Sequence, residues 1–213
     1  MQLHSKSVLG ALLVLSCATA QAVDAQAPQA AGVIFENVRI FNGTSGRLSG
    51  PSNVLVMGSV ITSISSAPIA DPSATSVTRI HGGGRTLMPG LIDAHTHIMF
   101  ATVPQAAVLT SDIGYVHVAA TKAATDMLMR GFTSIRDLGG PVFGLKRGID
   151  TDLVAGPRIW PAGAFISQTG GHGDFRLPNE LPAPPGHFSF SERVGPAAVA
   201  DSADTVRQRA REQ

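Results

Sequence analysis

The chain has 213 residues, and its 16 basic residues nearly balance its 15 acidic ones, which gives a formal net charge of +1. This balance argues against binding to nucleic acid or to an anionic membrane surface through bulk charge. Hydrophobic residues make up 44% of the chain, a share large enough to form a buried core and to exclude global disorder.

Residues 1–22 have the pattern of an export signal. A short basic start, MQLHSK, precedes the apolar stretch SVLGALLVLSCATA, which is too short to span a bilayer, and Ala20-Gln21-Ala22 fits a small-x-small cleavage site. A buried or anchoring helix is the alternative. We expect the protein to be exported to the periplasm or secreted, with no membrane attachment once the signal is removed.

Residues 23–32 are rich in Ala, Gln and Pro and predict a linker, and a series of strands follows it. VIFENVRIF (33–41) alternates apolar and polar residues, and NVLVMGSVITSIS (53–65) predicts two more strands. SVTRIHGGGRTLMPG (76–90) leads out of this region. Its Gly82-Gly83-Gly84 run predicts a tight bend rather than a phosphate-binding loop, because it is short and lacks the flanking residues of such a loop.

From Leu91 the pattern changes to an alternation of strands and helices. Strands are predicted in LIDAHTHIMF (91–100), TSIRDLGG (133–140) and RIWPAGAFIS (158–167), and helices in residues 115–131 and 142–156. This alternation indicates an α/β fold with a parallel sheet, either doubly wound or a barrel. Residues 168–196 are polar and Pro-rich without a period, which is typical of a functional or disordered loop. Asp201-Ser202 then cap a final helix.

His95 and His97 are the strongest candidates for chemistry. Residues i and i+2 of a strand point to the same face, so the two imidazoles would lie side by side at the strand's C-terminal end, where α/β barrels build their active sites. Two neutral imidazoles can share one divalent cation. Asp93 lies on the same face and could orient a histidine ring, or it could lie near the metal, behind the residues that bind the ion directly. A hydrogen-bonded histidine pair in a loop is the alternative.

TLMPGLIDAHTHI (86–98), together with GFTSIRDLGG, GPRIWPAGAFIS and TGGHGD, resembles the amidohydrolase superfamily. The resemblance is to a metal-dependent subgroup that contains imidazolonepropionase-like enzymes, Xaa-Pro dipeptidase-like enzymes and ochratoxinase-type amidases. It implies an α/β fold in which residues 89–213 form the first three βα units of a (β/α)8 barrel. Residues 33–88 would then form the N-terminal part of a small β-sandwich.

The resemblance also implies a site and a reaction. His95 and His97 match the family's first-strand ligands for one or two divalent ions, expected to be zinc, with manganese, cobalt or nickel as alternatives. A metal-activated water would then hydrolyse a carbon–nitrogen bond in a small amide or dipeptide-like substrate. Further candidates for the substrate pocket are His172 with its neighbours Gly171 and Asp174, and also Asp137. The alternative for His172 is a solvated loop residue. The alternative for Asp137 is a residue that only caps a loop.

The family also uses a lysine after the fourth strand, histidines after the fifth and sixth, and a proton-transferring aspartate after the eighth. From Leu91 to Gln213 there are about 120 residues, whereas a complete barrel needs about 250. We therefore expect these catalytic groups beyond Gln213. The 213-residue chain alone should be poorly folded and inactive, while the full-length protein would be a hydrolase and possible homo-oligomer.

Two other functions remain open from the sequence. One is a non-catalytic exported fragment that binds metal or a partner through His95 and His97. The other is a hydrolase of cyclic amides or lactones, which the same metal-water chemistry would serve.

Overall fold

The computed structural model describes residues 32–72, 76–101, 103–184 and 186–213, so the expected export signal (1–22) and all but the last residue of the linker lie outside the described residues. The described chain divides into two compact units, one ending at Leu87 and the other starting at Met88. Within these ranges, no helix is both long and apolar enough to cross a membrane.

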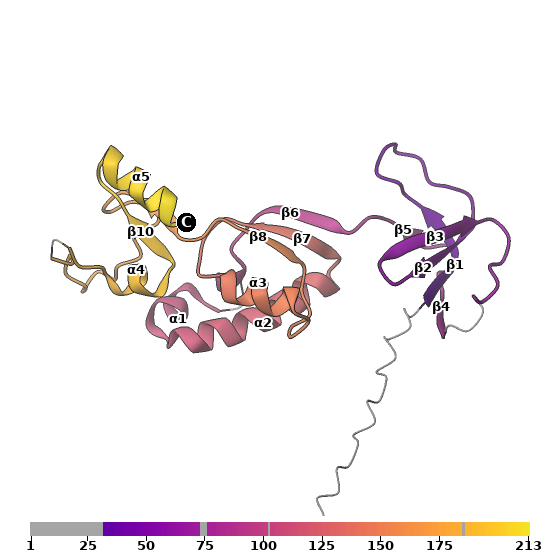
Figure 1. Cartoon of the computed structure of the whole chain (residues 1–213), viewed down its shortest axis with the longest axis horizontal. Helices are drawn as coiled ribbons and strands as arrows, with labels where there is room; N and C mark the ends of the chain where they lie inside the picture. The colour runs from indigo at the N-terminus through magenta and orange to yellow at the C-terminus, as the bar shows by residue number, and fades with distance from the viewer. Residues whose placement is uncertain (1–31, 73–75, 102, 185) are drawn as a thin grey trace, which may run out of the picture. The chain divides into compact units, whose positions relative to one another are not determined.

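The first unit is a five-stranded sheet (Figure 1). Its strands lie in the order β3-β2-β1-β4, and β5 pairs with the end of β1. β1 is antiparallel to β2 and parallel to both β4 and β5. The strands are β1 (Gly32–Ile40), β2 (Ser52–Met57), β3 (Val60–Ser65), β4 (Val77–His81) and β5 (Thr86–Leu87).

The apolar residues of β1 and β2 explain this sheet. Ile34 and Val38 of β1 are buried at positions of the same parity, as the predicted alternation requires, and the consecutive residues Val54 and Leu55 of β2 are both buried. The described part of this unit contains one sheet, so it supplies a single layer of the expected β-sandwich. The predicted strands in residues 33–41 and 53–65 are confirmed.

The glycine run between β4 and β5 forms the predicted tight bend. Gly83 and Gly84 have φ angles of +60° and +79°, which favour glycine. A Cβ atom at Gly82 would lie 2.4 Å from the Cγ1 of Val38, so this bend also needs close backbone packing.

The second unit contains a parallel three-stranded sheet in the order β6-β7-β8 (Figure 1). The sheet is open, and no barrel closes among the residues that the structure describes. Its strands are β6 (Leu91–Thr96), β7 (Phe132–Asp137) and β8 (Arg158–Pro161), and the connecting segments hold η1 (Ile98–Phe100), α1 (Gln105–Thr110), α2 (Ile113–Met129) and α3 (Phe143–Asp150).

Helix α2 forms where its sequence predicts. The Asp112 carboxylate caps it by accepting hydrogen bonds from the amides of Gly114 and Tyr115. Its buried side chains recur at three- and four-residue spacing and pack with β7, β8 and α3 in one core. The buried side chains of α2 are Val116, Ala120, Ala123, Ala124 and Met127.

Two expectations for this unit need correction. The helix predicted over residues 142–156 ends at Asp150, and Asp152 follows in a left-handed conformation with φ +58°. The strand predicted over residues 158–167 is two strands, β8 and β9 (Phe165–Ser167), because the chain turns at Gly163 with φ +88°. β9 then pairs in parallel with β10 (Ala197–Val199).

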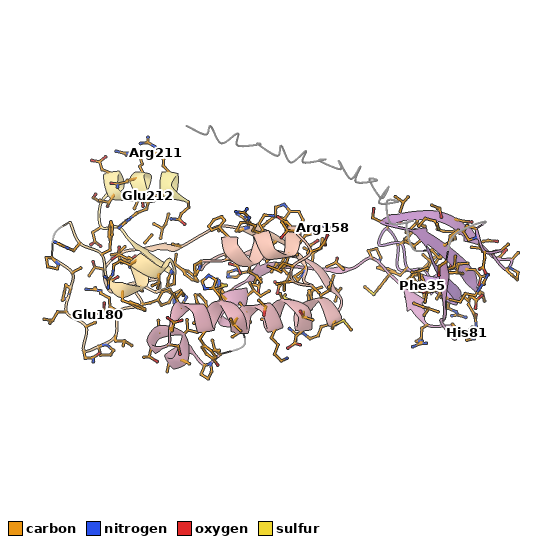
Figure 2. The ribbon with its side chains drawn as sticks, turned by 60° about the horizontal axis from the view of Figure 1, so that its bottom comes forward. Phe35, His81, Arg158, Glu180, Arg211 and Glu212 are labelled. Carbon is orange, nitrogen blue, oxygen red and sulfur yellow. The ribbon has the colours of Figure 1, made fainter. Side chains whose placement is uncertain are left out.

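The segment from residue 168 to residue 196 is more ordered than its composition indicates. It contains α4 (Phe190–Val194), whose N-terminus is a capping box made by Ser189 and Glu192. The last helix, α5 (Ala203–Glu212), begins after the predicted cap Ser202. Arg209 pairs with Glu192 at 3.0 Å and so ties α5 to α4, while Figure 2 shows the side chain of Arg211 extending away from the helix.

Candidate metal and substrate site

The two histidines lie at the C-terminal end of β6. His95 is within the strand and His97 follows directly after it, and their ring centroids are 5.3 Å apart with the ring planes nearly perpendicular. His95 is exposed and His97 is half-buried. Asp93 accepts a hydrogen bond from the backbone amide of His95 at 3.0 Å, so its observed contact is with the strand's backbone and not with an imidazole ring.

His97 carries an unused ring nitrogen. Its Nδ1 atom is buried and has no hydrogen-bond partner among the described residues. Burial lowers the pKa of His97. The neighbouring His95 and His172 lower it further, and a hydrogen bond with the backbone of Gly139 raises it. The imidazole is therefore neutral near pH 7 and keeps a lone pair that a cation could use. A backbone hydrogen bond on the same ring is typical of histidines that hold a metal.

The donor set around this pair is only partial. No group of three or more His, Cys, Asp or Glu side chains in the described ranges could hold a metal ion. Two adjacent imidazoles, one with a free buried nitrogen, fit one side of a divalent-metal site. They are fewer than the four ligands that a structural zinc site uses or the three of a catalytic one.

Asp137 is buried at the end of β7, next to β6. Its Oδ2 accepts a hydrogen bond from the amide of Ile98 at 2.8 Å, and its Oδ1 accepts one from the amide of Gly139 at 3.2 Å. Burial raises the pKa of Asp137 to about 6, against the effect of these two hydrogen bonds. The carboxylate thus fixes the backbone that follows β6 and the backbone that follows β7.

The loop after β9 carries His172, which is exposed and meets the ring of Phe165 edge-to-face at 6.3 Å. Asp174 does not hold this histidine: its carboxylate makes a two-point contact with Arg176, at 2.8 Å and 2.5 Å, and accepts a hydrogen bond from the amide of Gly170. The contact with Arg176 lowers the pKa of Asp174 to about 2. Asp174 therefore stabilises the loop that carries His172.

The glycines beside His172 are explained by packing within the protein. A Cβ atom at Gly171 would lie 2.3 Å from the Oγ of Ser167, and one at Gly173 would lie 2.7 Å from the Cβ of Phe165. The loop therefore lies directly on β9. The space beside both glycines is therefore filled by Ser167 and Phe165 of β9.

Phe165 joins the two histidine segments. Its ring centroid lies 4.8 Å from that of His97, 5.2 Å from that of Phe175 and 6.2 Å from that of Phe100. A cavity of about 220 Å³ opens among these rings and is lined by His97, Phe100, Val108, Leu109, Phe165, His172, Phe175 and Pro196.

Sequence reasoning did not single out Phe100, Phe175, Val108, Leu109 or Pro196 of this cavity. A signal was nevertheless present, because Phe100 follows His97 by three residues and Phe175 follows His172 by three residues. Of the predicted site residues, the structure places His97 and His172 at the same cavity. Asp93, Asp137 and Asp174 make the backbone and ion-pair contacts described above and do not line it.

Comparison with known proteins gives consistent relatives. Ochratoxinase from Aspergillus niger is 33% identical over 139 residues, which cover 59% of this chain and 28% of that protein. A crystal structure of a prolidase complexed with N-methylphosphonate-L-proline aligns with a TM-score of 0.71 at 32% identity, covering 85% of this chain and 43% of that chain. The crystal structure of A. niger ochratoxinase aligns with a TM-score of 0.62 at 26% identity, covering 86% and 44%.

This chain therefore spans less than half the length of each of these relatives. Residues 86–213, which contain β6, both histidines and the cavity, match the sequence profile of the amidohydrolase family. Since this match covers more than half of the chain, the chain belongs to the amidohydrolase family.

Proposed function

We propose that the full-length protein is a metal-dependent hydrolase that cleaves a carbon–nitrogen bond in a small amide or dipeptide-like compound. The observation that carries this proposal is the half-buried His97 imidazole, whose buried Nδ1 has no partner in the described residues and which lies beside His95 at the end of β6. Relatives named prolidase and ochratoxinase support hydrolysis of a small substrate.

In this proposal His95 and His97 hold a divalent cation, expected to be zinc. When bound, such a cation supplies a Lewis acid for the scissile carbonyl and lowers the pKa of a water molecule towards about 7. Phe165 packs against His97 and keeps water from one side of its ring. Asp137 fixes the backbone directly after that histidine, through the amide of Ile98, and the backbone after β7, through the amide of Gly139. The reaction needs further ligands and a proton-transferring group besides these.

Metal exchange in the full-length protein tests this function. The purified protein is treated with a chelator, reloaded separately with Zn²⁺, Mn²⁺, Co²⁺ or Ni²⁺, and assayed on a panel of dipeptides, N-acyl amino acids, cyclic amides and lactones. We expect activity on open-chain amides to disappear with the metal and to return with at least one of the four ions. Activity that persists at undetectable metal content would contradict the proposal, and activity confined to lactones would shift the substrate class.

We also propose that the protein acts in the periplasm or outside the cell, on the basis of the N-terminal sequence pattern. N-terminal sequencing of the protein isolated from its native host tests this separately. A mature protein that begins at Val23 is expected, and a protein that keeps residues 1–22 in the cytosol would contradict export.

A further inference from the structure

The cavity at His97 and His172 has these two histidines as the polar side chains of its lining and otherwise apolar walls. His97 and His172 provide its polar groups, and they come from different segments, the end of β6 and the loop after β9. The other walls come from Phe100, Phe165 and Phe175, with Val108 and Leu109 of α1 and with Pro196. Few convergent polar groups in an apolar pocket are typical of sites that bind small organic ligands.

The aromatic rings are arranged to accept another flat apolar group. Phe165 and Phe175 meet edge-to-face at 5.2 Å, and Phe165 and Phe100 lie near-parallel at 6.2 Å. Such ring pairs favour a further ring that offers an edge or an offset face. The cavity's phenylalanines, with Val108 and Leu109, are all only half-buried, so part of their apolar surface stays free even though Phe100 also packs against the core of this unit.

The volume limits what can enter. An apolar cavity of about 150 Å³ holds benzene, and this cavity measures about 220 Å³. A phenyl ring or a branched aliphatic side chain therefore fits, whereas a whole ligand of drug size needs about 300–1,000 Å³. The cavity is matched to one bulky apolar group of a larger molecule.

We propose that this cavity is a specificity pocket for one ring-sized apolar side chain of the amide substrate, held against Phe165 beside His97. The proposal rests on the hydrolase function proposed above and adds the substrate class: amides that carry an aromatic or large aliphatic group next to the reacting bond. Burial of such a group among the cavity's apolar side chains should favour it over a methyl group by roughly tenfold to a hundredfold in affinity.

Ligand binding by the full-length protein tests the pocket independently of catalysis. The probes are N-acetyl-L-phenylalanine and N-acetyl-L-alanine, titrated by calorimetry into the metal-free and the zinc-loaded protein. We expect the phenylalanine derivative to bind at least tenfold more tightly in both forms. In the unmutated protein labelled at Val and Leu methyl groups, the methyl resonances of Val108 and Leu109 should shift with this probe and not with the alanine derivative.

Variants then locate the effect. Leu109→Trp fills the cavity and should abolish the preference for phenylalanine, whereas the control Leu153→Trp, at a position that is 81% exposed, should keep it. Equal affinity for the two probes, or unchanged Val108 and Leu109 resonances, would overturn the pocket. These outcomes are separate from the fate of the hydrolase function, because a protein without amidase activity can still show the preference, and an active amidase can lack it.

Discussion

The ring of Phe165 occupies the space that a side chain at Gly139 would need. A Cβ atom at position 139 would lie 2.2 Å from the Cζ of Phe165, and the same ring lies 4.8 Å from that of His97. The loop after β7, the strand β9 and the histidine segment after β6 therefore meet at one ring. A substitution at Gly139 should therefore shift the Phe165 ring and with it the packing of His97.

Gly139→Ala should force the Phe165 ring to move and should lower the free energy of unfolding by about 1–3 kcal/mol, the usual cost of overpacking. The measurement is urea unfolding of the full-length protein. Gly144→Ala is the matched control, since a Cβ there would meet only the His117 ring, at 4.0 Å, and alanine favours a helix. In a protein that already carries Phe165→Ala, Gly139→Ala should cost little further stability, because the ring that its Cβ would meet is absent. Equal stability of Gly139→Ala and the control would contradict this packing.

The local parts of this fold follow from the sequence, and the long-range parts do not. Periodicity located β1, β2 and α2, and Ser202 was recognised as the cap of α5, because these features depend on neighbouring residues. The parallel pairing of β9 with β10 joins Phe165 to Ala197, more than thirty positions away, and no local pattern indicates it.

The same limit applies to the site. The D-x-H-x-H spacing placed two imidazoles side by side, and the structure has them so. It could not reveal that Asp93 contacts a backbone amide or that Asp174 takes Arg176 as its partner. Both contacts join residues only two positions apart, but a carboxylate next to a histidine has several partners within reach, and the spacing alone does not decide between them. The cavity combines residues of η1, α1, β9 and two loops, so it exists only in the folded unit.

Asp137 should make the metal-free protein less stable as the pH rises through the acid range. Its folded pKa of about 6 lies above its ordinary value of 3.8, so the folded state binds the proton more tightly than the unfolded state does. Its contribution is therefore fully favourable below about pH 4 and is lost as the pH approaches about 6, a change of about 3 kcal/mol.

Asp137→Asn should flatten that part of the pH profile of unfolding, measured by urea titration between pH 4 and pH 7. Asn keeps one acceptor for the amides of Ile98 and Gly139 and cannot titrate. Asp152→Asn is the control, because Asp152 is exposed and its left-handed backbone suits asparagine. A profile for Asp137→Asn that parallels the unmutated protein would show that this carboxylate does not titrate near pH 6.

Asp174 should act in the opposite direction at lower pH. Its pKa is lowered to about 2 from the ordinary 3.8, so its contribution of up to about 2 kcal/mol is present above about pH 4 and is lost as the pH falls towards 2. Asp174→Asn should remove this acid-sensitive component. Arg176→Lys should also weaken the loop, because lysine cannot make the two-point contact of the guanidinium.

The exposed pair of Lys146 and Asp150 provides the comparison for that experiment. Its side chains are 36% and 48% exposed, so Asp150→Asn should change stability by less than about 0.5 kcal/mol. Acid unfolding curves of the full-length variants, followed by circular dichroism, separate the two pairs. If both substitutions cost the same, the Asp174–Arg176 contact is no stronger than an ordinary surface ion pair.

The two histidines should differ in what their loss costs. His95 is exposed, so His95→Ala should leave the stability of the metal-free protein within about 0.5 kcal/mol. His97 packs on Phe165, so His97→Ala should lower it by roughly 1–3 kcal/mol.

Both variants should bind zinc at least tenfold more weakly, since even loss of a residue that only supports a ligand costs about 10–100-fold. The measurements are metal content by mass spectrometry and urea unfolding after chelation, with the exposed His81→Gln as control. Undiminished zinc affinity in His95→Ala would leave His97 as the sole ligand from β6 and its end.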